Sequence, residues 1–206
     1  MNQAEKSQRS REHILEAALQ LFSSQGYRAT SVRDIAAGAG VSTGNVYHHF
    51  PDKETIYLTL LDQYWEAIDD PNLPFNRALA TGTFPDNLEE VGHASRELVR
   101  VYRRHVALIY VDVVEFEGSH IRKFYAEMAQ RYASFMATHD GAKALAARLR
   151  PGISPASAAM FATRFYINYF AVEILFGVPN HFGKDSEAVI RETADILRHG
   201  MLRSRA

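Results

Sequence analysis

Residues 30–50 read Thr30-Ser31-Val32-Arg33-Asp34-Ile35-Ala36-Ala37-Gly38-Ala39-Gly40-Val41-Ser42-Thr43-Gly44-Asn45-Val46-Tyr47-His48-His49-Phe50. The spacing of Ser31 and Asp34 is that of a capping box, which predicts a helix beginning after Ser31. Glycine then interrupts this helix, and Gly40 can adopt the positive φ of a tight turn. Ser42 supplies the cap of a third helix that runs to about His49. Two short helices joined by a glycine turn are typical of a helix-turn-helix DNA reader.

The start of the third helix has the small and polar side chains that a DNA-reading helix needs. Such a helix approaches the floor of the major groove closely, and residues 42–45 are Ser, Thr, Gly and Asn. Glycine inside a helix costs about 1 kcal/mol relative to alanine, so Gly44 suggests close backbone approach to DNA. The alternative is a compact helical hairpin that binds nothing.

Helices are also predicted on both sides of this segment. Residues 10–25 have apolar side chains at helical spacing, with Ser7 or Ser10 as the cap and Gly26 as the stop. Pro51-Asp52 opens a further helix with Glu54 in its first turn. The apolar positions expected to face the core are Ile14, Ala17, Ala18, Leu21 and Phe22 in the first helix, and Ile56, Leu60, Leu61, Tyr64, Trp65 and Ile68 in the later one.

Composition excludes several classes of protein. Of the 206 residues, 47% are hydrophobic and 23% charged, which favours a sizeable core over disorder. The absence of cysteine excludes disulfides and thiolate metal sites. The polar N-terminus shows no signal peptide, and no apolar run is long enough for a membrane span, so a cytoplasmic protein is expected. The net charge is −1, and residues 1–53 have only a weak basic excess, so DNA affinity needs hydrogen bonds or a dimer.

Beyond residue 69 the sequence predicts further helices. Residues 69–85 are rich in helix breakers and form the best internal boundary. The run 106–114 is ambiguous, because its β-branched residues favour a strand whereas its setting favours a buried helix. The other predicted helices are 86–104, 119–149 with a break at Asp140-Gly141, 155–177 and 185–202, and the last two are broadly apolar.

The N-terminal segment carries a long, ordered motif. Its matching residues are Ile14, Ala17-Ala18, Leu21-Phe22, Gly26-Tyr27, Thr30, Val32-Arg33-Asp34-Ile35-Ala36, Ala39-Gly40-Val41-Ser42, Gly44, Tyr47, His49-Phe50 and Lys53-Glu54. With these residues the segment resembles the TetR family of bacterial transcription regulators over residues 10–65. Position 48, often aromatic in the family, is histidine here.

The resemblance implies an all-α homodimer. A three-helix DNA-binding domain would span residues 1–53, the helix 54–69 would connect, and residues 70–206 would form a larger domain for effector binding and dimerisation. The dimer would form through helices 155–177 and 185–202. The DNA contacts implied are Thr30, Ser42, Thr43, Gly44, Asn45, Tyr47, His48, His49 and Lys53.

An effector pocket is expected among the helices between residues 86 and 176, a region rich in aromatic side chains that suits a hydrophobic or aromatic small molecule. For any single residue, plain core packing is the competing explanation. The residues selected are Tyr102, Met128, Tyr132, Phe165 and Tyr169. The sequence also contains an acidic cluster with one histidine, formed by Asp112, Glu115, Glu117 and His120. We interpret it as a solvated corner of the fold, with side chains exposed to water, rather than as a metal site.

The sequence thus predicts a ligand-responsive repressor that is released from a palindromic operator by its effector. The alternative keeps the DNA reader and makes the larger domain a platform for a protein partner. No phosphate-binding loop, nucleophile elbow or metal signature is visible, so neither an enzyme nor a cofactor is expected.

Overall fold

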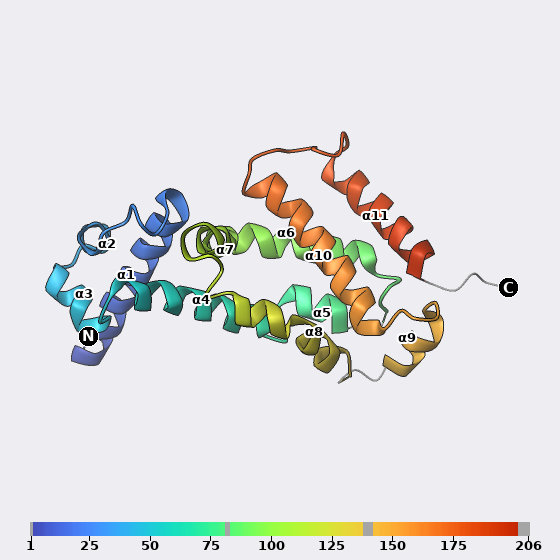
Figure 1. Ribbon diagram of the computed structural model, residues 1–206, viewed down its shortest axis with the longest axis horizontal. Helices are drawn as coiled ribbons and strands as arrows, with labels where there is room; N and C mark the ends of the chain where they lie inside the picture. Colours follow the sequence, from blue (N-terminus) through green and yellow to red (C-terminus); the bar gives the residue numbers. More distant parts are fainter. Residues whose placement is uncertain (1, 81–82, 138–141, 202–206) are drawn as a thin grey trace. The chain divides into compact units, whose positions relative to one another are not determined.

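The computed structural model describes residues 2–80, 83–137 and 142–201, and the regular structure in these ranges is helical throughout (Figure 1). The chain divides into two compact units. The N-terminal unit combines residues up to 67 with residues 104–122, and the C-terminal unit combines residues 68–103 with those from 123 onward. Residues 104–122, predicted to belong to the larger domain, therefore pack with the N-terminal helices.

The N-terminal unit contains α1 (Gln3–Gln25), α2 (Val32–Ala39), α3 (Thr43–His49), most of α4 (Lys53–Asp69) and most of α7 (Arg103–Phe116). Helix α1 begins earlier than the sequence predicted. Asn2, rather than Ser7 or Ser10, is its cap, and Asn2 forms a capping box with Glu5. The predicted stop is confirmed, because Gly26 ends the helix with φ of 88°.

The core of this unit is built from one face of each helix. In α1 the buried face includes Leu15 and Leu19, whereas Ala17 and Leu21, predicted to be inward, are only half-buried. In α4 the fully buried Tyr57 was missed, and it contacts the rings of Phe22 and Phe116 at 5.5 and 5.2 Å. The ambiguous run 106–114 is helical, as part of α7. Helix α7 therefore closes the N-terminal core.

The C-terminal unit contains the remaining helices. They are α5 (Pro74–Ala80), α6 (Leu88–Val101), α8 (Arg122–Ala137), α9 (Ala142–Arg148), α10 (Pro155–Ile174) and α11 (Ser186–Met201). Helix α5 corrects the prediction that residues 69–85 form only a boundary, because Phe75, Ala78 and Leu79 bury an apolar face there. The predicted break at residues 140–141 lies outside the described residues.

Helix α6 is central to the C-terminal unit and packs against α5, α10 and α11. Gly92 allows the closest approach, because a Cβ atom there would lie 3.0 Å from Ile190 and 3.1 Å from Tyr166. The Tyr166 hydroxyl in turn donates to the carbonyl oxygen of Ile190 at 3.2 Å. Among the described residues, none of the helices combines the length and the apolar composition of a membrane span.

Candidate DNA-binding interface

Local side-chain caps build the α2–turn–α3 segment as the sequence predicted. Ser31 and Asp34 form a reciprocal capping box at the start of α2. Gly40 ends α2 in the left-handed region with φ of 67°, and its N–H reaches the last carbonyls of that helix. Ser42 Oγ accepts from the backbone N–H of Asn45 at 3.1 Å and starts α3. The helix-turn-helix prediction is therefore confirmed in its geometry.

The outer face of α3 is presented to solvent. Ser42, Thr43, Gly44 and His48 are exposed, and Tyr47 keeps 54% of its surface exposed. A Cβ atom at Gly44 would meet nothing closer than the Ser42 hydroxyl, at 3.9 Å. Packing within the chain therefore does not require glycine at position 44, which leaves the approach of an external surface as its physical reason.

Asn45 differs from its neighbours on α3. It is half-buried, and its side-chain Oδ1 is buried without a hydrogen-bond partner in the structure. A buried amide oxygen without a donor costs free energy. An outside donor that reached Asn45 would remove this cost, which fits the predicted role of Asn45 in base recognition.

His49 and Phe50 join the end of α3 to the core. Phe50 is buried, and the Arg11 guanidinium lies 5.2 Å from the centre of its ring. Burial lowers the pKa of His49, and the nearby charges of His48 and Arg11 lower it further. His49 is therefore neutral near pH 7 and offers one N–H donor rather than a positive charge.

Thr30 and Lys53 are both among the residues predicted to contact DNA. In this structure both side chains donate hydrogen bonds to backbone carbonyl oxygens of the N-terminal unit. The Thr30 side chain is buried and its hydroxyl donates to the Gly26 carbonyl oxygen at 2.8 Å. Lys53 Nζ donates to the carbonyl oxygens of Tyr27 at 2.8 Å and Thr30 at 2.7 Å, and lies 4.0 Å from the centre of the Tyr27 ring. Burial lowers the pKa of Lys53. Backbone carbonyls, which sequence spacing does not reveal, take up these donors in the free chain, and the predicted DNA contacts of Thr30 and Lys53 stay predictions.

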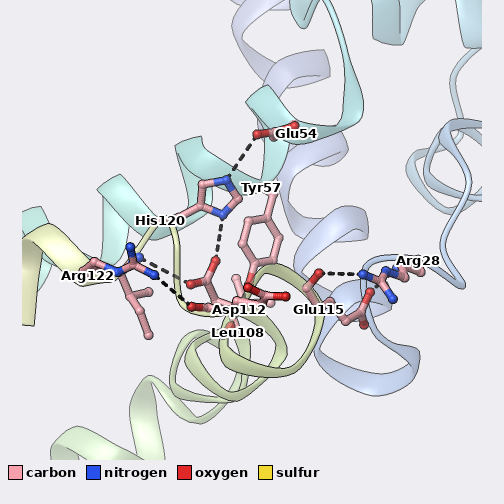
Figure 2. A network of polar contacts seen from close by, with 10 residues as sticks. Arg28, Glu54, Tyr57, Leu108, Asp112, Glu115, His120 and Arg122 are labelled. Carbon is pink, nitrogen blue, oxygen red and sulfur yellow. Dashed lines mark hydrogen bonds and ion pairs between the residues drawn. The ribbon is translucent and has the colours of Figure 1, made fainter.

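The same turn is held from its other side by α7 (Figure 2). Glu115 accepts from the backbone N–H of Tyr27 at 3.0 Å and of Arg28 at 2.6 Å. The Arg28 guanidinium donates back to the Glu115 carbonyl oxygen at 2.9 Å. Glycine is required at position 26 for two reasons. Its φ is positive, and a Cβ atom there would lie 2.4 Å from the Glu115 carboxylate. The α1–α2 turn is thus fixed by Lys53 at its carbonyls and by Glu115 at its N–H groups.

The acidic cluster on α7 is not the solvated corner that the sequence suggested. Asp112 is fully buried, and its Oδ1 lies 2.7 Å from Nδ1 of His120. Nε2 of the same ring lies 3.2 Å from Glu54 on α4. The described residues contain no group of histidine and carboxylate side chains arranged to hold a metal ion. The cluster therefore joins α7 to α4. The sequence signal that could have revealed it is the position of Asp112 and His120 on either side of Gly118.

The predicted effector residues lie in the C-terminal unit in different settings. Tyr169 is buried and stacks on His181 at 4.5 Å, and Phe165 and Tyr169 both contact the ring of Phe182. The Tyr132 hydroxyl lies 2.5 Å from Thr163 Oγ1, and burial raises its pKa. Tyr102 and Met128 are half-buried. The predicted effector role of the five residues stays a prediction.

Comparison with known proteins places this site in a family. Residues 14–60, which include α2 and α3, match the family described as bacterial regulatory proteins, tetR family. The helix-turn-helix segment of the chain is thus that of the tetR family. It is 30% identical over 132 residues to the HTH-type transcriptional repressor KstR2 of Mycolicibacterium smegmatis, over 58% of this chain and 63% of that protein. It is 44% identical over 62 residues to the HTH-type transcriptional regulator AcrR of Shigella flexneri, over 30% of this chain and 27% of that protein.

The chain therefore spans less than two thirds of the length of these curated tetR-family relatives. Solved structures extend the likeness of fold to nearly the whole chain. A putative TetR-family regulator from Mesorhizobium loti has a TM-score of 0.67 at 21% identity and covers 98% of this chain and 100% of its own. NalD of Pseudomonas aeruginosa has a TM-score of 0.63 at 21% identity, covering 97% and 100%. The all-α class with an N-terminal helix-turn-helix is thereby confirmed.

Proposed function

We propose that this protein is a sequence-specific DNA-binding transcriptional repressor that reads DNA through α3. The single observation that carries the proposal is the exposed, small and polar start of α3, where Gly44 has no internal packing reason to be glycine. The base-reading group is Asn45, supported by Ser42 and Thr43, with Tyr47 and His48 against the sugar-phosphate backbone. Relatives named as repressors support the same function.

We propose further that two copies join through α10 and α11. The supporting observation is a set of large apolar side chains left exposed on and between these helices. They are Phe161 and Ile196, which are 64% and 63% exposed, and Phe176, Val178 and Phe182. Packing these side chains against a second copy would remove their apolar surface from water, which favours a dimer. A dimer would place two copies of α3 in consecutive major grooves, about 34–36 Å apart.

The effector that we propose is a small hydrophobic or aromatic molecule bound in the C-terminal unit. The support is the set of partly buried aromatic side chains around α8 and α10, with the Tyr132–Thr163 hydroxyl pair as a polar anchor. Ligand and DNA would bind with reciprocal coupling, so an operator duplex would weaken effector binding by the same factor as effector weakens operator binding.

The experiment that tests the proposal is selection of genomic fragments with the purified protein, followed by binding measurements on the selected duplex and on a scrambled duplex. Asn45→Ala should abolish the difference between the two duplexes, whereas Gln20→Ala, an exposed change on α1, should leave it intact. If the wild-type protein selects no inverted repeat, the proposal is wrong. If it selects one as a monomer, or if a protein partner covers Phe161 and Ile196, the proposed dimer is wrong.

A further inference from the structure

The side-chain amide of Asn45 makes no contact that would compete with DNA. Among the described residues no hydrogen bond engages either end of this amide, and its Oδ1 is covered without a donor. By contrast, Asn76 donates to the carbonyl oxygen of Ile68 at 2.7 Å, and Asn87 donates to that of Ala78 at 2.6 Å. A half turn about the Cβ–Cγ bond of Asn45 therefore breaks no hydrogen bond and exchanges the positions of Oδ1 and Nδ2.

The composition of α3 narrows the choice of base. Arginine and lysine pair with guanine, and carboxylates accept from the amino group of cytosine, but the sequence of α3 contains none of these residue types. The Ser42 hydroxyl accepts from the backbone N–H of residue 45 as the helix cap. Asn45 carries the one amide of α3, with an acceptor and a donor side by side on the same planar group.

Asn45 also lies at the part of a reading helix that meets base edges. It is the third residue of α3, and the N-terminal residues of a recognition helix are those that contact bases. The exposed Gly44 beside it adds no side chain between the backbone and an approaching groove. In the major groove, adenine presents the N7 acceptor next to the N6 amino donor, and one amide can bond both. The amide of Asn45 therefore matches adenine in chemistry and in position.

We propose that Asn45 reads an adenine in the major groove, with Oδ1 accepting from the N6 amino group and Nδ2 donating to N7. This pairing rests on the proposed DNA-reading role of α3. It gives the amide oxygen the donor that the free chain does not supply. Guanine presents the O6 acceptor where adenine has its amino group, so the amide oxygen would face another oxygen there. In an inverted repeat bound by two copies, the same adenine recurs in each half-site.

The test measures the affinity of the full chain for the inverted repeat that it selects, with base analogues at each adenine of a half-site. 7-Deazaadenine lacks the N7 acceptor, and unsubstituted purine lacks the 6-amino group. We expect one adenine at which each analogue weakens binding and at which guanine weakens it by about 10-fold. A selected repeat in which no adenine responds to both analogues overturns this inference and leaves the proposed function standing. A chain that selects no repeat overturns both.

A variant then assigns the responsive adenine to its reader. Asn45→Ala should bind the natural and the analogue duplexes equally, whereas Gln20→Ala, which removes an exposed amide on α1, should keep the wild-type differences. Because Ser42 bonds the backbone N–H of residue 45, Asn45→Ala keeps the helix cap, and melting temperatures check that it folds. Differences that persist in Asn45→Ala would overturn the inference. So would equal weakening of the selected and scrambled duplexes by Asn45→Ala, which indicates a phosphate contact.

Discussion

Glu115 accepts a hydrogen bond from the backbone N–H of Arg28 at 2.6 Å, across 87 residues of sequence. Arg28 lies in the segment that joins α1 to α2. The Glu115 carboxylate also accepts a hydrogen bond from the backbone N–H of Tyr27 in the same segment. The orientation of α2 relative to α1 therefore depends on a residue from α7.

Glu115→Ala should lower the free energy of unfolding of the N-terminal unit by about 1–3 kcal/mol, because it leaves the partly buried N–H of Tyr27 and the exposed N–H of Arg28 without their acceptor. Thermal unfolding followed by circular dichroism measures the change. Glu117→Ala removes an exposed carboxylate two residues away and serves as the control. Equal melting temperatures for Glu115→Ala and the wild type would contradict the role of Glu115 in holding the turn.

Lys53→Met should destabilise the protein by about 1–2 kcal/mol, because its ammonium donates to two carbonyl oxygens of the turn. The family resemblance gives Lys53 a contact with DNA, and this variant distinguishes that role from the structural one. The decisive comparison is between melting temperature and the salt dependence of DNA binding. If Lys53→Met kept the wild-type stability and reduced the slope of log DNA affinity against log salt concentration by about one, Lys53 would be a phosphate contact.

Two glycine substitutions should separate binding from packing. Gly44→Ala should leave stability unchanged or slightly higher, since its Cβ would meet only Ser42 at 3.9 Å, and should weaken DNA binding. Gly92→Ala should destabilise the C-terminal unit by about 1–3 kcal/mol, because its Cβ would press on Tyr166 and Ile190. Parallel melting and duplex titrations measure both, and normal affinity in Gly44→Ala would argue against close approach of α3 to DNA.

His105 should make the N-terminal unit less stable in acid. Burial lowers the pKa of this histidine, which stacks on Tyr64 at 5.7 Å. Its folded pKa is below the unfolded value of about 6.5, so the unfolded chain binds the extra proton first and stability falls as the pH drops through this range. His105→Asn should flatten the loss of melting temperature between about pH 7 and about pH 5. An unaltered pH profile would show that another group carries the effect.

The dimer proposal has a direct test in Ile196→Glu, which replaces an exposed apolar side chain of α11 by a charged one. Burying an unpaired carboxylate in an interface is costly, so the variant should be monomeric at concentrations where the wild type is a dimer. Analytical ultracentrifugation measures the change. Gln20→Glu, on α1, controls for the added charge, and a dimeric Ile196→Glu variant would place the interface elsewhere.

The sequence by itself determined the parts of the site that depend on neighbours along the chain. The capping box of Ser31 and Asp34, the left-handed Gly40 and the cap at Ser42 each act over three or four residues, so their spacing was enough to predict α2, the turn and α3. The apolar period likewise predicted most helices. Helix α5 was missed because Pro74 and the helix breakers around it hide a short apolar face that packs against α6.

Only the tertiary structure decided what the polar residues behind the reading helix do. Lys53 and Tyr27 are 26 residues apart, Glu115 and Tyr27 are 88 apart, and His120 and Glu54 are 66 apart. A lysine or a carboxylate bonds whichever partner the folded chain brings within about 3 Å, and no local pattern encodes that partner. For this reason the caps of α2 and α3 have the roles that the sequence assigned, whereas the internal contacts of Thr30, Lys53 and the acidic residues of α7 depend on packing.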